Sequence, residues 1–309
     1  MTFGTAAIAE AAAIIRAGGC VAVPTETVYG LAADATNSQA VAGIYAAKGR
    51  PSFNPLIVHL PDLAAAERIA VFDDRARDLA RRFWPGPLTL VLPLRPESQI
   101  ASLVTAGLPT VALRVPRHRA MQALLAASGR PLAAPSANAS GSISPTRAEH
   151  VAASLAGRIP LVIDDGATPA GIESTIVAGD AILRPGPLTA AVLGLADRVA
   201  TTAGIVAPGQ MSSHYAPGKP VRLGVTVADP DEWLIGFGAV AGDDTLSATG
   251  DPAEAAARLF DALHRADAAP APRIAVAPVP ESGIGVAIND RLRRAAFPRD
   301  ATPAGNTAG

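Results

Sequence analysis

The chain has 309 residues, of which 49% are hydrophobic, and its 26 basic residues nearly balance 27 acidic ones. This length favours about two domains with buried cores and excludes a chain that is disordered throughout. A net charge of -1 excludes a global polycation that would hold nucleic acid by counterion release. The single cysteine, Cys20, excludes an internal disulfide and a multi-cysteine zinc site, and it indicates a reducing, cytoplasmic setting.

The first twenty residues carry no basic segment of the kind that opens a signal peptide. No run of about eighteen apolar residues occurs anywhere in the sequence. We therefore expect neither secretion nor a membrane-spanning helix.

Apolar periodicity predicts short helices and strands over the first two hundred residues. We expect helices over 5–17, with an N-cap, over 38–48, with Ser38 as its cap, over 74–84, and around 121–129. Strands are expected at 20–23, 56–60, 88–92, 110–115, 160–163, 174–177 and 181–183. Thr146 and Glu149 form a capping-box signature for a further helix through Leu155. This mixture predicts an α/β domain, a twisted mixed sheet with flanking helices, over residues 1–200.

From about residue 201 the sequence is rich in Gly, Pro, Ala and Ser, which predicts a linker over 201–220. Strands at 221–225, 234–237 and 274–277, a helix opened by Asp251 and Pro252, and a basic helix at 289–296 follow. They predict a smaller α/β domain over 221–298. The tail 299–309 has nothing to bury and is expected to be disordered.

A basic stretch without acidic neighbours lies in the first domain. Between Asp34 and Asp62 no acidic residue occurs, yet Lys48, Arg50 and His59 lie there. One interpretation is that a phosphate or carboxylate binds among them. The other is that Lys48 caps the end of the preceding helix and Arg50 points into water.

Common nucleotide and metal motifs are missing. No glycine loop ends in Lys-Ser or Lys-Thr, and the five histidines show no metal-ligand spacing. The loop 133–146 offers small residues whose main-chain N–H groups can approach a phosphate, although an ordinary surface loop has the same composition. Arg114 projects from a predicted strand, where it suits either a carboxylate ligand or a structural ion pair.

A family resemblance follows from a series of motifs in a fixed order. These are PTETVYGLAADA, KGRPSFNPLIVHL, WPGPLTLVL, TVALRVP, APSANASGSISPT, GIESTIV and LRPGP. Over about residues 18–187 they resemble the YrdC-type domain of threonylcarbamoyl-AMP synthases. HYAP at 214–217 and GIGVAINDRLRRAA at 283–296 resemble the linker and the smaller, Rossmann-like C-terminal domain of the two-domain form.

The resemblance implies an activity and its partners. The family joins L-threonine, bicarbonate and ATP into threonylcarbamoyl-adenylate and pyrophosphate, with Mg²⁺ on the phosphates. A separate transferase complex then moves the threonylcarbamoyl group to the tRNA adenosine beside the anticodon. The resemblance leaves room for a weak contact with tRNA. An RNA-binding module without adenylate-forming activity is the alternative function.

The resemblance also implies the site residues. It assigns the L-threonine pocket to Thr27, His59, Arg114, Ala134 and Ser174. It assigns the ATP side to Lys48, Arg50, Asn54, Thr110, Ser136, Asn138, Ser144, Arg184 and Tyr215. Lys48 and Arg50 are the candidate catalytic residues, acting on the charge of the triphosphate, and no side chain is assigned to a metal. The linker is expected to act as a lid, although Met211 to Ser213 depart from the basic or aromatic residues usual in the family.

Overall fold

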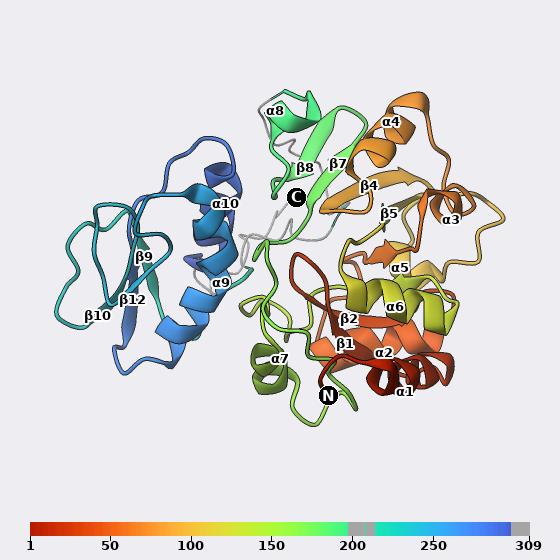
Figure 1. The fold of residues 1–309 in the computed structure, drawn as a ribbon, viewed down its shortest axis with the longest axis horizontal. Coiled ribbons are helices and arrows are strands. Elements are labelled where there is room, and N and C mark those ends of the chain that lie inside the picture. Colours follow the sequence, from red (N-terminus) through yellow and green to blue (C-terminus); the bar gives the residue numbers. More distant parts are fainter. Residues whose placement is uncertain (197–206, 208–213, 298–309) are drawn as a thin grey trace, which may run out of the picture.

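The computed structural model describes residues 1–196, 207 and 214–297. The predicted disordered tail and most of the predicted linker lie outside the described residues. In the described part of the chain, no helix is both long and apolar enough to span a membrane. The helices and strands divide between a larger sheet, built from residues 21–184, and a smaller one, built from residues 221–276 (Figure 1).

The larger sheet has eight strands in the order β1-β2-β6-β3-β5-β4-β7-β8. Its strands are β1 (Val21–Pro24), β2 (Tyr29–Asp34), β3 (Ile57–His59), β4 (Leu88–Pro93), β5 (Thr110–Arg114), β6 (Leu132–Ala133), β7 (Thr175–Ala178) and β8 (Ala181–Arg184). The pairs β3–β5 and β4–β7 are parallel, whereas the other neighbours are antiparallel. The predicted mixed sheet is therefore confirmed. The predicted strand at 160–163 is wrong, because that segment forms only an isolated bridge through Val162.

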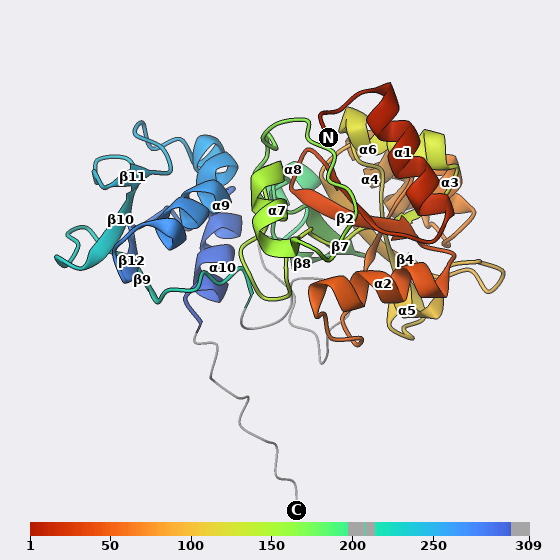
Figure 2. The same cartoon turned by 90° about the horizontal axis from the view of Figure 1, so that it is seen from below.

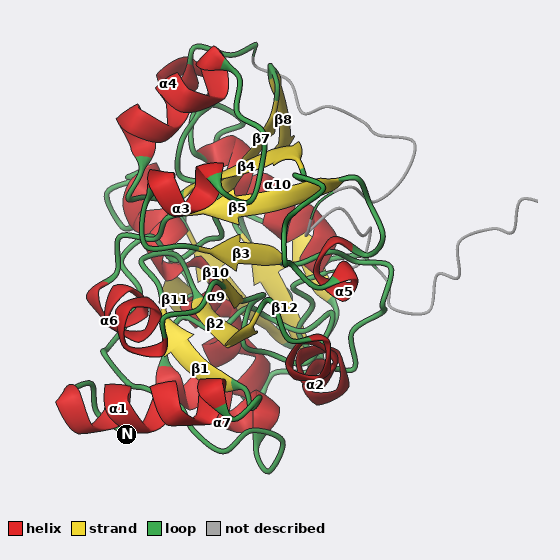
Figure 3. Ribbon diagram, turned by 90° about the vertical axis from the view of Figure 1, so that its right-hand side faces the viewer, coloured by secondary structure: helices red, strands yellow, loops and turns green. Residues whose placement is uncertain are grey.

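Helices cover both faces of this sheet. They are α1 (Thr5–Arg16), α2 (Ser38–Lys48), α3 (Leu63–Glu67), α4 (Asp74–Phe83), α5 (Ser102–Thr105), α6 (Arg119–Ser128), α7 (Ala148–Leu155) and α8 (Ala190–Leu193). Val21 and Val23 of β1 pack with α1 and α6, whereas Ala22 packs in the cluster that contains α2. Figure 3 shows α6 and α2 on opposite sides of β1 and β2. This part of the sheet is therefore buried on both faces.

The start of α2 is capped by a different residue from the one predicted. The side chain of Asn37, not Ser38, accepts hydrogen bonds from the main-chain N–H groups of Gln39 and Ala40, at 2.9 and 3.2 Å. Helix α1 begins at Thr5 after Gly4, without a side-chain cap, so its predicted cap is also wrong. The cap of α2 is thus displaced by one residue and that of α1 is missing, while both helices are where they were predicted.

The capping box predicted for α7 is wrong, whereas the cap of α9 is confirmed. Helix α7 has Arg147 at its N-cap without a side-chain bond, and the main-chain N–H of Thr146 donates instead to Nδ1 of His150 at 3.3 Å. In the second unit, α9 (Pro252–Ala268) begins with Asp251, whose carboxylate accepts from the N–H of Ala253 at 2.7 Å. A proline at the first helical position after an acidic cap is the arrangement expected there.

The smaller sheet is parallel throughout, in the order β11-β10-β12-β9. Its strands are β9 (Val221–Leu223), β10 (Glu232–Gly236), β11 (Asp244–Thr245) and β12 (Arg273–Val276), and its helices are α9 and α10 (Gly285–Ala295). A parallel sheet covered by helices fits the predicted smaller, Rossmann-like α/β unit. Figures 1 and 2 show α9 and α10 between this sheet and the larger unit.

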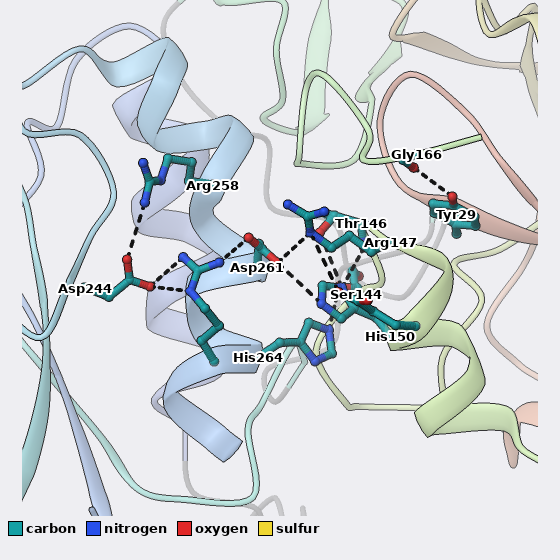
Figure 4. A network of polar contacts seen from close by, with 12 residues as sticks. Tyr29, Ser144, Thr146, Arg147, His150, Gly166, Asp244, Arg258, Asp261 and His264 are labelled. Atoms are coloured by element: carbon teal, nitrogen blue, oxygen red, sulfur yellow. Dashed lines mark hydrogen bonds and ion pairs between the residues drawn. The ribbon is translucent and has the colours of Figure 1, made fainter. Parts of the chain in front are cut away.

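The two units touch through a polar network between α7 and α9 (Figure 4). Nε of Arg147 lies 3.0 Å from Oδ1 of Asp261, and the rings of His150 and His264 stack with centroids 3.8 Å apart. Close main-chain packing adds to this contact. At Gly171, which has a φ of +68°, a Cβ atom would lie 2.4 Å from a carbonyl oxygen of α9, so only glycine fits there.

Candidate functional site

A buried cavity of about 50 Å³ lies where β3 and β5 end, and residues of the larger unit line it together with His214 and Tyr215. Nine of the fourteen predicted site residues line it, namely Thr27, Arg50, His59, Arg114, Ala134, Ser136, Ser174, Arg184 and Tyr215. All five residues predicted for L-threonine are among them. Register explains part of this convergence, because His59 of β3 and Arg114 of β5 are direct neighbours in a parallel pair.

Arg114 is held in place by the protein itself. Its Nη2 lies 2.7 Å from Oε1 of Glu26, its Nη1 donates to Oγ1 of Thr27 at 2.9 Å, and its Nε donates to the main-chain oxygen of Gly86. Burial alone would raise the pKa of Glu26, but the charge of Arg114 and hydrogen bonds to the carboxylate lower it. Of the two interpretations of Arg114, the structure thus contains the structural ion pair, with the guanidinium still on the cavity wall.

His59 is a neutral group in this wall. Burial, and then the charge of Arg114, lower its pKa to about 3, so the ring stays uncharged at neutral pH. Its Nδ1 is buried and has no hydrogen-bond partner among the described residues. A buried polar atom without a partner is costly, so a ligand that supplies a partner at this atom would bind favourably.

Arg50 and Lys48 form a second, cationic part of the site. Arg50 donates to the main-chain oxygens of Asn54 and Pro55, at 3.1 and 2.9 Å, and burial and the charge of Arg184 lower its pKa to about 10. Lys48 is buried, and its Nζ donates to the main-chain oxygens of Ser136 and Asn138 at 2.5 Å. Among the described residues, no carboxylate pairs with Lys48 or Arg50.

The alternative interpretation, in which Lys48 caps its helix and Arg50 points into water, is therefore wrong on both counts. Lys48 does not cap the end of its own helix, because its amino group reaches the loop 133–146. Arg50 does not point into water, because it is only 8% exposed. Burial and the neighbouring charge of Arg50 lower the pKa of Lys48 well below its ordinary value, and a negative charge placed beside it would act in the opposite direction.

The loop 133–146 is held on the sheet by its own main chain. The N–H groups of Ala137 and Ser140 donate to the carbonyl oxygens of Tyr29 and Lys48, both at 2.8 Å. Nδ2 of Asn138 donates to the carbonyl oxygen of Ser142, also at 2.8 Å. Several main-chain N–H groups that were expected to approach a phosphate thus already donate hydrogen bonds within the protein. The role of the loop that the structure contains is to bind the amino group of Lys48 through its carbonyl oxygens.

Ser174 and Arg184 join the ends of β7 and β8 beside the cavity. Nε and Nη2 of Arg184 donate to the main-chain oxygen of Ser174, at 3.2 and 3.0 Å, while Oγ of Ser174 lies 2.7 Å from Oγ1 of Thr89. Gly186 makes this approach possible, because a Cβ atom there would lie 2.4 Å from the main-chain nitrogen of Thr175. The motifs GIESTIV and LRPGP therefore form one piece of the wall.

His214 and Tyr215 come from beyond the first sheet and close the cavity. The adjacent Ala216 donates its N–H to the carbonyl oxygen of Gly141 at 2.9 Å, which ties this segment to the loop 133–146. Tyr215 is fully buried, has a φ of +63°, and its hydroxyl has no hydrogen-bond partner among the described residues. Burial, followed by the charges of Arg50 and Lys48, lowers the pKa of His214 well below its ordinary value.

Five predicted residues do not line the cavity: Lys48, Asn54, Thr110, Asn138 and Ser144. Asn54 supports Arg50 through its main-chain oxygen, and Lys48 binds the loop that carries Asn138. Thr110 starts β5 four residues before Arg114, which is about 13 Å along a strand. The role of Thr110 stays a prediction.

Groups of three or more potential metal-ligand side chains are absent among the described residues. Arg114, Arg117, His118 and Arg119 form a basic cluster in the sequence, and their side chains have partners within the protein. Arg119 pairs with Asp165, and the main-chain N–H of Ala120 donates to Nδ1 of His118.

Comparison with known proteins decides the family. A family model described as telomere recombination, Sua5/YciO/YrdC, matches residues 13–186. A second, described as the C-terminal domain of threonylcarbamoyl-AMP synthase, matches residues 172–297. The chain is 42% identical to the threonylcarbamoyl-AMP synthase of Bacillus subtilis, over 94% of this chain and 92% of that protein. The chain belongs to the threonylcarbamoyl-AMP synthase family.

Other family members agree with this assignment. The threonylcarbamoyl-AMP synthase of Pyrococcus abyssi is 40% identical, over 92% of each chain. The crystal structure of P. abyssi Sua5 complexed with L-threonine matches with a TM-score of 0.85 and 39% identity, over 94% of both chains. The match extends over both units, so the two-domain form of the threonylcarbamoyl-AMP synthase family is the relevant one. The alternative of an RNA-binding module is not favoured.

Several site residues were not assigned a role from the sequence, among them His214, which belongs to the quoted HYAP motif. Glu26 pairs with Arg114, and Glu173 lines the cavity and accepts from Oγ of Ser144 at 2.5 Å. Arg291 of α10 binds Glu173 from the second unit. A signal for Arg291 exists, since it falls among Ala287, Ile288, Leu292 and Ala295 on the buried face of its helix. A charge on such a face indicates a buried partner.

Proposed function

We propose that this protein is a threonylcarbamoyl-AMP synthase that joins L-threonine, bicarbonate and ATP into L-threonylcarbamoyladenylate and pyrophosphate. One observation carries the proposal. Three arginines, Arg50, Arg114 and Arg184, converge on a buried cavity that is closed by Tyr215. Such a site suits a substrate with a carboxylate together with one that carries phosphates.

L-threonine binds on the side of the cavity formed by β3 and β5. The guanidinium of Arg114 faces the carboxylate of the amino acid while Glu26 keeps the arginine in position. Neutral His59 offers Nδ1 to a polar group of the substrate, and Thr27 and Ser174 offer hydroxyls. A site that hydrogen-bonds a substrate hydroxyl discriminates strongly against analogues that lack it.

ATP binds on the side of the cavity formed by Arg50, Arg184, His214 and Tyr215. Lys48 and Arg50 offset the negative charge of the triphosphate and of the departing pyrophosphate. Burial lowers the pKa of both groups, and a bound anion would favour their charged forms. Because the described residues form no carboxylate cluster, we infer that Mg²⁺ enters on the phosphates of ATP. It would supply further neutralisation of the triphosphate.

The reaction balances without a covalent intermediate on the protein. The nitrogen of L-threonine attacks the carbon of bicarbonate, and loss of water leaves a carbamate. A carbamate oxygen then forms a bond to the α-phosphorus of ATP as the bond to the pyrophosphate oxygen breaks. The protein contributes orientation and charge, and the cover made by His214 and Tyr215 keeps water from the hydrolysable adenylate.

We further infer that the product passes to a separate transferase complex that acts on tRNA in the cytoplasm. RNA binding by this protein itself is the less favoured alternative, because the arginine and histidine side chains of residues 117–119 have partners within the protein. An extended aromatic stacking platform for RNA is also unsupported by a composition of 4% aromatic residues.

The function is tested by mass spectrometry of a reaction that contains the full chain, Mg²⁺, ATP, bicarbonate and L-threonine. Each substrate is omitted in turn, and pyrophosphate is measured in parallel. We expect the adenylate and pyrophosphate only in the complete mixture. Pyrophosphate release that does not depend on L-threonine, or the lack of any adenylate, would contradict the proposal.

A further inference from the structure

Arg291 is a buried cation that the second unit places against the first. It lies on α10 with no exposed surface, yet three of its four hydrogen bonds among the described residues go to residues of the larger unit. Its Nε donates to Oε2 of Glu173 at 3.1 Å, and its Nη1 donates to the main-chain oxygen of Pro185 at 2.5 Å. Its own helix contributes Asp290, whose Oδ2 lies 3.1 Å from Nη1.

Glu173 connects this arginine to the cavity. Its second carboxylate oxygen, Oε1, accepts a hydrogen bond from Oγ of Ser144 at 2.5 Å, so both oxygens are engaged. Glu173 lines the cavity, and Ser144 is among the residues predicted for ATP. The carboxylate thus holds the loop 133–146 on one side and the second unit on the other.

Arg291 also supports the residue that closes the cavity. Its Cζ lies 5.6 Å from the centroid of the Tyr215 ring, whose other side faces Phe260 of α9 with centroids 5.4 Å apart. Pro185, bound by the same guanidinium, follows Arg184 directly. One side chain therefore contacts three parts of the wall, at 173, 185 and 215.

The charge of Arg291 matters as much as its contacts. Without it, the buried carboxylate of Glu173 would face the cavity with Ser144 as its remaining side-chain hydrogen-bond partner among the described residues. A buried charge that loses its partner is strongly unfavourable, and a negative one would repel the phosphates of an incoming nucleotide.

We propose that Arg291 is a positioning residue for ATP, which makes the second unit a part of the nucleotide site. It neutralises Glu173 and fixes the ring of Tyr215 and the turn at Pro185. This rests on the proposed function. The residues on the threonine side, Arg114 and His59, have no contact with Arg291 among the described interactions, so the effect is selective for the nucleotide.

The test compares Arg291→Met with Arg293→Met in the full chain. Arg293 is on the same helix, but its side chain is 57% exposed and pairs with Glu281. We expect Arg291→Met to raise the KM for ATP by about 10- to 100-fold. The KM for L-threonine should stay within about threefold of the original value, and Arg293→Met should change neither. Calorimetry with ATP alone and with L-threonine alone gives the same comparison as binding constants.

Two further variants separate positioning from folding. Adding Glu173→Gln to Arg291→Met removes the unpaired carboxylate and should recover part of the ATP affinity. Arg291→Lys retains the charge, so its affinity for ATP should lie between those of the original protein and Arg291→Met. If Arg291→Met does not fold, Arg291→Lys is compared with Arg293→Met instead. Parallel losses of ATP and threonine affinity, or an ATP affinity equal to that of Arg293→Met, would overturn the proposal.

The outcome is distinguishable from failure of the proposed function. If the original protein forms no adenylate, the function is wrong, whereas the calorimetric comparison still reports whether Arg291 governs ATP binding. If the original protein forms the adenylate and Arg291→Met keeps an unchanged KM for ATP, only the role of Arg291 is wrong.

Discussion

Arg114 and Glu26 lie in contact inside the protein, with Nη2 of the arginine 2.7 Å from Oε1 of the glutamate and both side chains at least 90% buried. The partner of this arginine comes from a residue 88 positions earlier in the chain. Oε2 of the same glutamate accepts the main-chain N–H of Arg117, which fixes the carboxylate as well. The guanidinium therefore has one orientation before any substrate is present.

Replacing Glu26 with glutamine should destabilise the fold by about 3–5 kcal/mol at pH 7, because a buried guanidinium loses its anion. The pKa of Glu26 is lowered, so its contribution is present above the unfolded pKa of about 4.3 and is lost as pH falls through the lower folded value. Urea unfolding at pH 7 and pH 3 measures this. A difference between Glu26→Gln and the original protein that stays constant over this range would contradict the pair.

Binding of ATP should take up protons near Lys48 and Arg50. Burial lowers the pKa of both groups, and a bound triphosphate favours their charged forms, so their pKa values rise on binding. By linkage, the affinity for ATP should then fall as pH rises from 7 to 10. Calorimetry in two buffers with different ionisation enthalpies reports the proton number directly. Lys48→Met should reduce the uptake, and equal heats in both buffers would rule it out.

Stability should fall in mild acid because of His150. Burial, followed by the nearby charges of His264, Arg147 and Arg265, lowers its pKa to about 3, while Asp261 acts in the opposite direction. Between pH 3 and about 6.5 the unfolded chain binds a proton at this residue that the folded chain does not, so stability decreases by up to about 1.4 kcal/mol per pH unit.

The matched variant for this test is His150→Phe, which keeps an aromatic ring against His264 but cannot titrate. Its unfolding free energy should depend less steeply on pH between 4 and 6 than that of the original protein. Thermal or urea unfolding at several pH values gives the slopes, and identical slopes would exclude His150 as the source.

Gly171→Ala should separate the two units. A Cβ atom at this position would lie 2.4 Å from the carbonyl oxygen of Ala257, and its φ of +68° is unfavourable for alanine. The control is Gly157→Ala, since Gly157 has a φ of +73° but no atom within 4 Å of the added Cβ. We expect the control to lose about 1 kcal/mol and Gly171→Ala to lose clearly more. Melting temperatures decide this, together with the rate of proteolysis between the units.

Local sequence patterns predicted most elements that have one exposed face or a clear end. The helix at α9 was placed by Asp251 and Pro252, and β5 by the alternation of Val111, Leu113 and Val115. Strand β2 was missed because its residues Tyr29–Asp34 are buried on both faces, which removes the alternation that marks a strand. Gly30 in β2 also weakens the strand pattern, because it has no side chain. Its small size lets Ala134 pack directly against the strand.

The site residues were found by resemblance, whereas their partners were not. Lys48 binds main-chain oxygens about 90 positions away, and no sequence pattern identifies a carbonyl group as a partner. Glu26 lies inside the quoted motif PTETVYGLAADA, in the turn between β1 and β2, and Arg114 lies at the end of β5. Their pairing depends on how the sheet brings these two places together. Such partners follow from tertiary packing, which composition and spacing do not encode locally.

The backbone of Tyr215 has a consequence of its own. A left-handed φ of +63° is uncommon for a bulky residue and costs on the order of 1–3 kcal/mol. The contacts of its ring with Phe260 and Arg291 offset that cost only while the ring stays buried. Loss of those contacts would therefore be accompanied by relaxation of φ toward negative values, so the ring and the chain direction are expected to change in a single step.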